Sequence, residues 1–342
     1  MRLPSPRNLL QKPLAQPTCS FAGKNILVTG ANTGLGFEAA QKFTALGASR
    51  VILGVRDLKK GERAKSLIEE RTGVKDRIDV WQLDMNSYQS IREFAVRADA
   101  TDISVDIALL NAGVYSVNYR QSPYGWEETL QVNVLSTALL ALLLLPKLRK
   151  SSSVERNNNG AVLEFVSSRR HEVVTISEDR KRRQNLLRSF NNAETFKSSE
   201  QYQVSKLFVM CIMQVLSSLA KTSGVRVTAI CPGFCQSDLS RGHQGIVAGI
   251  IRTILNTLVL RTAEEGSRTL VSGAALGPEA HGMFWYDDEL HQASAPILAG
   301  PEGEDFRRKI WGEVIEALKM DVPEVEERLG ELEGLEQGRQ SN

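Results

Sequence analysis

A glycine-rich turn between a short apolar run and a helical pattern constrains the fold of this chain more than any other stretch. Residues 26–28 form the apolar run, which is typical of a buried parallel strand. Glycines follow at Gly30, Gly34 and Gly36, and apolar residues then recur at helical spacing. The first N–H groups of a helix attract anions, and glycine lets a diphosphate approach the backbone. This stretch therefore predicts a nucleotide-binding turn between a strand and a helix.

Strands and helices alternate from Phe21 onward, which predicts an α/β domain with helices on both faces of a parallel sheet. We expect strands at 25–29, 51–55, 78–83, 106–110, 161–167, 226–231 and 282–286. We expect helices near 34–47, 58–72, 87–98, 124–149, 200–221, 262–275 and 302–319. The domain then spans 21–320, with a flexible or surface-draped arm at 1–20 and a polar tail at 321–342 that fits a frayed helix.

Composition argues against several kinds of partner. The formal charge is +2 over 342 residues, so no general attraction to nucleic acid is expected. The longest apolar run, 138–145, is stopped by Pro146 and falls short of the roughly 20 residues of a membrane span. The cysteines favour buried thiols in a reducing compartment, so we expect a cytoplasmic protein. Cys231 and Cys235 lack the neighbours of a zinc site, and no metal is expected.

The strongest catalytic signal is Tyr202 followed four positions later by Lys206, because residues at this spacing share one face of a helix. A phenol with a pKa of about 10 is a poor acid–base group at neutral pH, and a nearby ammonium should lower that pKa. Ser167 and Ser168 end the preceding strand, where a serine hydroxyl can hold a substrate oxygen or simply form a turn. Together these residues predict an acid–base site.

Residues at the ends of three other strands indicate how the nucleotide is held. Arg56 stands where an acid normally binds an NAD ribose, and its guanidinium suits a 2′-phosphate instead, which favours NADP(H). The alternative is an exposed arginine paired with Asp57. Asp84 can accept a hydrogen bond from the adenine amino group, or it can cap its strand. The small residues at 111–113 let the nucleotide pass close to the end of the fourth strand.

These motifs, in this order, resemble those of the short-chain dehydrogenase/reductase family over residues 21–320. Within the family, the chain is similar to the retinol-dehydrogenase-like branch, and especially to soluble fungal members found in secondary-metabolite pathways. The matching positions are Thr29, Gly30, Gly34, Gly36, Asp84, Asn111, Ala112, Gly113, Asn133, Ser168, Tyr202, Lys206, Pro232 and Gly233. The resemblance implies a single doubly wound Rossmann-type domain with a mostly seven-stranded parallel sheet and a helical substrate lid at 234–261.

The same resemblance implies a role for each site residue. Tyr202 is the proton donor in carbonyl reduction, and Ser168 orients the carbonyl. Lys206 lowers the pKa of the tyrosine and binds the nicotinamide ribose, while Asn133 holds a water that links this lysine to solvent. The implied cofactor-binding residues are Gly30, Asn32, Thr33, Gly34, Leu35, Gly36, Arg56, Asp84, Met85, Asn111, Ala112, Gly113, Tyr202, Lys206, Pro232 and Gly233.

The chain departs from the family pattern between Ser168 and Tyr202, which lie 34 positions apart where many members have a gap of about thirteen. The choice between Ser167 and Ser168 as the carbonyl-orienting residue therefore stays open. The inserted segment is basic, which fits a solvated loop better than a phosphate site. His171 can face the pocket or be a plain loop histidine.

The segment 236–260 carries apolar residues at helical spacing. As a lid it favours an apolar ketone, aldehyde or alcohol, although core packing or contact with a lipid surface or second subunit gives the same pattern. We expect an NADP(H)-dependent reductase of such carbonyl compounds, acting as a homodimer or homotetramer. Oxidation of a retinoid- or steroid-like alcohol and a non-catalytic nucleotide sensor are the alternatives.

Overall fold

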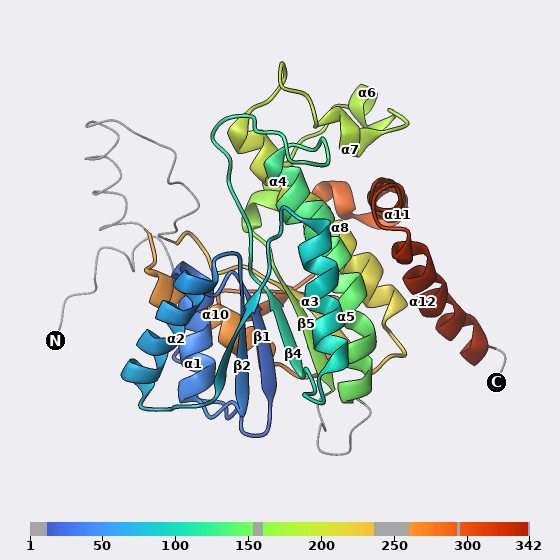
Figure 1. Cartoon of the computed structure of the whole chain (residues 1–342). Coiled ribbons are helices and arrows are strands. Elements are labelled where there is room, and N and C mark those ends of the chain that lie inside the picture. The colour runs from blue at the N-terminus through green and yellow to red at the C-terminus, as the bar shows by residue number, and fades with distance from the viewer. Residues whose placement is uncertain (1–11, 153–159, 236–259, 293–294, 341–342) are drawn as a thin grey trace, which may run out of the picture.

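A single sheet of eight strands lies at the centre of the protein, in the order β3-β2-β1-β4-β5-β6-β7-β8 (Figure 1). The computed structural model describes residues 12–152, 160–235, 260–292 and 295–340, without the side chains of 333 and 335–340. The strands are β1 (Asn25–Thr29), β2 (Arg50–Val55), β3 (Ile78–Gln82), β4 (Ile107–Leu110), β5 (Ala161–Val166), β6 (Val225–Ile230), β7 (Phe284–Tyr286) and β8 (Glu289–His291). Strands β1 to β7 pair in parallel, which confirms the seven-stranded parallel sheet.

The eighth strand, β8, pairs antiparallel with β7 and was not expected from the sequence. Asp287 and Asp288 form the turn between the two strands, with φ angles of 51° and 57°. Aspartate tolerates this left-handed region better than most residues do. The turn lacks the glycine that usually marks a tight hairpin, which is why the sequence pattern gave no signal for it.

Helices cover both faces of the sheet (Figure 1). Side chains alternate along a strand, so Leu27 of β1 enters one core while Ile26 and Val28 enter the other. The first core includes α3, α5 and α8, and the second includes α1, α2 and α10. The helix bounds are α1 (Gly34–Ala45), α2 (Leu58–Thr72), α3 (Tyr88–Ala100), α4 (Glu128–Leu130), α5 (Thr137–Ser152), α6 (Glu178–Lys181), α7 (Leu186–Ser189), α8 (Ser198–Leu219), α10 (Ala263–Ala274), α11 (Gly300–Lys319) and α12 (Glu324–Gln340).

Short 3-10 and π segments complete the fold. A π-helical turn, η2 (Gln131–Ser136), joins α4 to α5. The 3-10 turns are η3 (Arg169–Val173), η5 (Pro278–Ala280) and η6 (Pro296–Leu298). Two helical stretches, Glu128–Ser152 and Ser198–Leu219, are long and apolar enough to cross a membrane by length and composition alone. In their apolar windows 94% and 67% of the residues are buried inside the protein, as in core helices.

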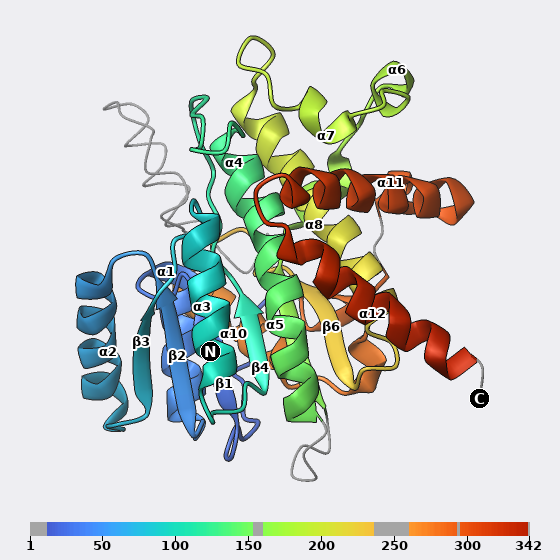
Figure 2. The ribbon, with the colours of Figure 1, turned by 45° about the vertical axis from the view of Figure 1, so that its right-hand side comes forward.

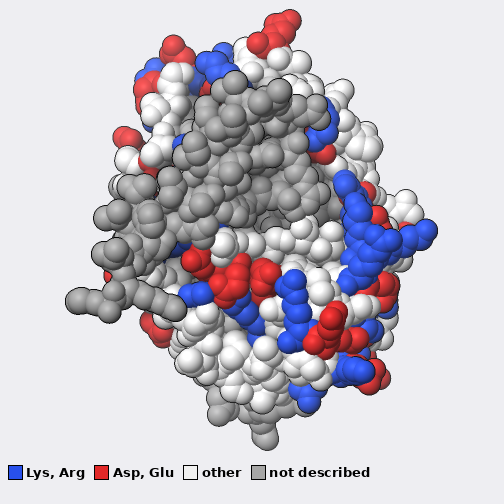
Figure 3. Space-filling view, turned by 90° about the vertical axis from the view of Figure 1, so that its left-hand side faces the viewer, with Lys and Arg blue, Asp and Glu red and all other residues white. Residues whose placement is uncertain are grey.

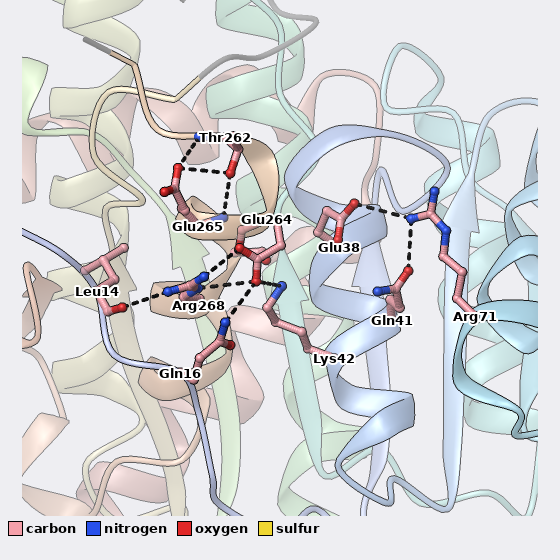
Figure 4. A network of polar contacts seen from close by, with 11 residues as sticks. Leu14, Gln16, Glu38, Gln41, Lys42, Arg71, Thr262, Glu264, Glu265 and Arg268 are labelled. Carbon is pink, nitrogen blue, oxygen red and sulfur yellow. Dashed lines mark hydrogen bonds and ion pairs between the residues drawn. The ribbon is translucent and has the colours of Figure 1, made fainter. Parts of the chain in front are cut away.

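The described part of the N-terminal arm, residues 12–20, lies along the surface of the domain, which is the draped alternative (Figure 4). The side chain of Leu14 is 6% exposed, and its carbonyl accepts a hydrogen bond from Arg268 Nη1 at 3.0 Å. Gln16 lies against Arg268 and Glu264 of α10. This part of the arm is therefore attached to the domain, and residues 1–11 lie outside the described residues.

The C-terminal helices α11 and α12 pack beside α8 and α5 (Figure 2). Helix α11 corresponds to the helix expected at 302–319. In the following polar tail, Val322, Val325, Leu329 and Leu332 are buried in the larger core. The first half of this tail therefore packs as part of the domain instead of fraying.

The inserted segment after Ser168 contains η3, α6 and α7 and lies at the top of the molecule in Figure 1. Three of its basic side chains, Arg169, Arg180 and Lys181, form ion pairs. Arg180 Nη1 lies 3.1 Å from Glu200 Oε1, and Lys181 Nζ lies 2.6 Å from Glu178 Oε1. Because acidic side chains already neutralise these cations, the ion pairs fit a solvated loop better than a phosphate site.

Candidate active site

A cavity of about 810 Å³ lies at the carboxyl ends of the parallel strands, where the strand order reverses between β1 and β4. The face seen in Figure 3 is hollowed, with Lys and Arg side chains gathered on one side of the hollow. The predicted site residues that line the cavity are Gly30, Asn32, Thr33, Gly34, Leu35, Arg56, Asp84, Met85, Asn111, Ala112, Gly113, Ser168, Tyr202, Lys206, Pro232 and Gly233. Gly36 and Asn133 are absent from this lining and lie behind it.

The glycine turn between β1 and α1 has the geometry of an anion cradle. Gly30 and Gly34 have φ angles of 65° and 58°, which side chains disfavour. At Gly36, an added Cβ would lie 2.6 Å from the carbonyl oxygen of Gly30 and 2.5 Å from Asn111 Nδ2. Gly36 therefore lets α1 pack against the turn, while the first N–H groups of α1 stay directed at the cavity.

Tyr202 and Lys206 both enter the cavity from the first half of α8, as their spacing predicts. Lys206 Nζ lies 5.6 Å from the centre of the Tyr202 ring and donates a hydrogen bond to the carbonyl of Val166 at 2.9 Å. Lys206 is 7% exposed, and burial lowers its pKa to about 8. Burial also raises the pKa of Tyr202, and the hydrogen bond with Ser168 opposes this only in part.

The direction of the Tyr202 pKa is opposite to the one expected from the sequence. The expected ammonium is present, but its nearest acceptor is the Val166 carbonyl, and the phenol itself is withdrawn from water. Desolvation disfavours the charged phenolate more than the nearby charges favour it. The tyrosine is therefore protonated at neutral pH in this structure, which is the form that a proton donor requires.

Ser167 and Ser168 both line the cavity at the end of β5, and their hydroxyls differ in hydrogen bonding. The hydroxyl of Ser167 is buried and has no hydrogen-bond partner among the described residues. The hydroxyl of Ser168 accepts from the N–H of Arg170 at 3.3 Å and caps η3. Its side chain also acts to lower the pKa of Tyr202, so it lies near the phenol, and the choice of Ser168 as the carbonyl-orienting serine stays a prediction.

Asn133 lies in η2 and is 2% exposed. Its Nδ2 donates to the carbonyl of Val114 at 2.9 Å and to Ser205 Oγ at 3.1 Å, and its Oδ1 accepts from the N–H of Val114 at 2.8 Å. Ser205 in turn donates to the carbonyl of Tyr202 at 2.7 Å. Both amide hydrogens are used within the protein, so Asn133 ties the loop after β4 to α8, and the water that the family resemblance implies there stays a prediction.

Arg56, Asp57 and Lys60 line the other end of the cavity. Asp57 caps α2 by accepting from the N–H of Lys60 at 3.1 Å, and its carboxylate lies 3.9 Å from Lys60 Nζ. No ion pair joins Asp57 to Arg56 among the described residues, so the alternative of a paired arginine is not seen. Asp84 accepts from the N–H of Asn86 at 3.0 Å, which is the strand-cap alternative, and it also faces the cavity.

Several cavity residues are absent from the predicted site, among them Tyr115 and Arg170. The Tyr115 ring meets Tyr202 edge to face, with centroids 5.1 Å apart and planes at 85°. The guanidinium of Arg170 lies 5.5 Å from the centre of the Phe234 ring. Tyr115 stands two positions after the 111–113 turn, and that closeness to a predicted cofactor contact is the one clue that could have found it.

Arg261 links the cavity wall to two distant segments and is 6% exposed. Its Nη1 donates to the carbonyl of Pro232 at 3.2 Å, and its Nη2 donates to Asp287 Oδ1 at 2.7 Å and to the Lys12 carbonyl at 2.6 Å. Its N–H donates to the carbonyl of Phe234 at 2.7 Å, which joins the two ends of the predicted lid. Residues 236–259 of the predicted lid lie outside the described residues.

The cysteines near the cavity are free thiols. Burial raises the pKa of Cys231 and raises that of Cys235 to about 12, so neither is a thiolate at neutral pH. Among the residues that the structure describes, no group of three or more His, Cys, Asp or Glu side chains is placed to hold a metal ion.

Comparisons with known proteins agree with this geometry. Residues 24–173 match the family model described as short chain dehydrogenase. The chain is 42% identical over 315 residues to the short-chain dehydrogenase/reductase phmF of Phaeosphaeria nodorum, covering 92% of each chain. It is 42% identical over 320 residues to the short-chain dehydrogenase/reductase ffsI of Aspergillus flavipes, covering 93% of each.

A solved structure shares the fold at lower identity. L-sorbose reductase from Gluconobacter frateurii, solved with NADPH and L-sorbose, aligns with a TM-score of 0.60 and 18% identity. The alignment covers 79% of this chain and 96% of that one. The sequence relatives span nearly the whole chain at well above 30% identity. With the α/β fold and the lined cavity, these relatives show that the chain belongs to the short-chain dehydrogenase/reductase family, a family of oxidoreductases.

Proposed function

We propose that this protein is an NADP(H)-dependent oxidoreductase of the retinol-dehydrogenase-like branch that interconverts an apolar ketone or aldehyde and its alcohol. One observation carries the proposal: Ser168, Tyr202 and Lys206 meet at one end of a cavity whose other end is lined by Arg56. Reduction of a ketone in fungal secondary-metabolite biosynthesis is the role we propose, and the fungal relatives support it.

The residues at the nucleotide end fit a phosphorylated dinucleotide. The turn with Gly30 and Gly34 offers main-chain N–H groups to a diphosphate. A side chain on Gly36 would collide with the Gly30 carbonyl and push α1 away from this turn. Arg56 and Lys60 bring two positive charges to the rim, which suits a 2′-phosphate. L-sorbose reductase, which shares the fold, was solved with NADPH.

The proposed chemistry divides between cofactor and protein. When bound, NADPH supplies a hydride to the carbonyl carbon. The Ser168 hydroxyl donates a hydrogen bond to the carbonyl oxygen and orients it beside Tyr202. Tyr202, which burial keeps protonated, donates its proton to the same oxygen as negative charge develops there. Lys206, placed one helical turn further along α8, stabilises the phenolate that remains.

The experiment is an NADPH-oxidation assay with apolar probe carbonyls such as decanal, acetophenone and phenanthrenequinone. Changing Tyr202 to Phe should lower the rate by about 10² or more, because a positioned proton donor is lost. Tyr119→Phe is the matched control, since Tyr119 lies outside the cavity lining and its hydroxyl contacts Asn191. Equal rates for Tyr202→Phe and wild type would remove the mechanism, and NADPH binding without turnover of any probe would favour the nucleotide-sensor alternative.

We also propose that the enzyme acts in the cytoplasm on a small apolar substrate, as a homodimer or homotetramer, without nucleic-acid partners. The balanced charge and the free thiols support this proposal. Light scattering of the purified full chain measures the oligomeric state, and a monomer at micromolar concentration would contradict it.

A further inference from the structure

We propose that His171 is a positioning residue that fixes Ser168 in the active site by holding its main-chain carbonyl; the inference rests on the function proposed above. His171 is 0% exposed and lies in η3, the 3-10 turn that begins just after Ser168. Its Nδ1 lies 2.7 Å from the carbonyl oxygen of Ser168, and its main-chain N–H donates to the same oxygen at 3.0 Å. One carbonyl therefore receives two donors from one residue.

The partner of His171 determines its tautomer. A carbonyl oxygen can only accept, so Nδ1 carries the hydrogen of the neutral ring and Nε2 carries the lone pair. Nε2 is buried without a hydrogen-bond partner among the described residues. The ring meets Phe284 edge to face, with centroids 5.1 Å apart and planes at 83°. The polar contact that the structure gives this buried side chain is the bond to Ser168, and burying an imidazole without such a bond is costly.

This contact acts on the backbone from which the serine hydroxyl projects. Ser168 is extended, with φ −156° and ψ 141°, and its hydroxyl caps the turn through the N–H of Arg170. A 3-10 turn has weaker hydrogen-bond geometry than an α-helix and depends more on such anchors. Because His171 contributes both donors, the peptide plane after Ser168 cannot rotate without breaking both bonds. The serine is thereby held in its place in the cavity lining, which Tyr202 shares.

The ring performs this task as a neutral group. Burial lowers the pKa of His171, the hydrogen bond to Ser168 and the charge of Glu172 raise it, and Arg169 lowers it. Helix α8 and strand β7 pack against the turn, and among the described residues they add no charged group to this set. Protonation at Nε2 would place a charge beside the Phe284 ring with no partner, which the site disfavours.

A double-mutant cycle tests the proposal in the full-length enzyme, with NADPH and whichever of decanal, acetophenone or phenanthrenequinone the wild type reduces. His171→Phe keeps a buried ring but removes the donor, and His171→Asn keeps an N–H near the position of Nδ1. We expect His171→Phe to lower kcat about tenfold, as a small displacement of a reacting group does, with the Kd for NADPH unchanged. His171→Asn should restore most of the rate. In a Ser168→Ala background, His171→Phe should have almost no further effect.

The control is His281, whose two ring nitrogens both contact main-chain groups. Its Nε2 lies 2.8 Å from the carbonyl of Ser217, its Nδ1 lies 3.3 Å from the N–H of Val227, and it does not line the cavity. His281→Phe should lower stability but leave kcat near the wild-type value. Equal losses from His171→Phe in the wild-type and Ser168→Ala backgrounds would overturn the proposal, and so would a loss in His171→Asn as large as in His171→Phe.

A replacement variant and a measurement without turnover distinguish a failure of this inference from a failure of the proposed function. If His171→Phe does not fold, His171→Leu replaces it in the cycle. If the wild type reduces no probe, the proposed function fails, and ¹⁵N spectra of the histidines then decide the inference alone. The signal that disappears in His171→Asn should be that of a neutral Nδ1–H ring at neutral pH, and an Nε2–H ring there would contradict the contact with Ser168.

Discussion

Glu264 at the start of α10 connects three parts of the chain, and its charge should stabilise the fold measurably (Figure 4). Its Oε1 lies 3.0 Å from Lys42 Nζ on α1, and its Oε2 lies 2.8 Å from Arg268 Nη2 on α10. Arg268 also holds the carbonyl of Leu14 in the N-terminal arm. An acid in the first turn of a helix is favoured by the helix dipole as well. We therefore predict that Glu264→Gln loosens the contacts among α1, α10 and the arm.

The magnitude follows from the pKa of Glu264. Burial raises this pKa, but the hydrogen bonds and charges of Arg268 and Lys42 outweigh burial and lower it from 4.5 to about 2. A difference of this size corresponds nominally to about 3.4 kcal/mol of stability. The Glu264 side chain is 40% exposed, so solvent screens its partners, and we discount the effect to about 1 to 2 kcal/mol. Lys42, at 11% exposure, is the less screened partner.

The sign of the pH dependence is fixed by the lowered pKa. The stabilisation is fully present above the unfolded pKa of 4.5 and is lost as pH falls toward the folded value of about 2. Urea unfolding of wild type and Glu264→Gln at neutral pH should therefore differ by about 1 to 2 kcal/mol, and the difference should shrink below pH 4.5. Glu316→Gln is the matched control, because Glu316 is 77% exposed and lies 3.7 Å from Lys319. A change in Glu264→Gln no larger than in this control, or one independent of pH, would refute the reasoning.

Two further predictions concern the nucleotide end of the cavity. Arg56→Asp should raise the Kd of NADPH by about tenfold or more while changing that of NADH little, because a charge-assisted contact to a 2′-phosphate is replaced by repulsion; equal changes for the two nucleotides, measured by fluorescence titration, would count against the role of Arg56. Gly36→Ala should lower both the Tm and the NADPH affinity, because the new Cβ would lie 2.6 Å from the Gly30 carbonyl oxygen and push α1 outward. An unchanged Tm in Gly36→Ala would show that the turn accommodates the added Cβ without loss of stability, which would contradict the prediction.

Local patterns and motifs in the sequence predicted most of the sheet and about half of the cavity lining. The apolar run at 26–28 and the glycines after it specify a strand, a turn and a helix within twelve residues, so no distant contact is needed to recognise them. The carboxyl ends of parallel strands meet at one edge, so residues that follow those strands come together once the sheet is parallel. Tyr202 and Lys206 share a helix face for an equally local reason.

Features that depend on distant partners were missed or had their direction reversed. Strand β8 has only three residues and follows an aspartate turn, and its antiparallel pairing with the expected strand β7 is what orders it. The tail after residue 320 looks polar in sequence, yet α11 and the core offer its few apolar side chains a surface. For the arm the sequence left the flexible and the surface-draped alternatives open, and only the contacts of Arg261 and Arg268 with the carbonyls of Lys12 and Leu14 decide between them for the described part.

By itself the sequence determined the order of the elements up to β7 and the position of the nucleotide turn, because both are specified by short-range spacing, and its motifs pointed to about half of the residues that line the cavity. Only the tertiary structure decided how those groups are solvated and held. Spacing placed an ammonium near the Tyr202 phenol, but burial raised the phenol's pKa, since desolvation depends on every segment that packs around it. The same holds for His171, which is a loop residue in sequence and a buried donor to Ser168 in space.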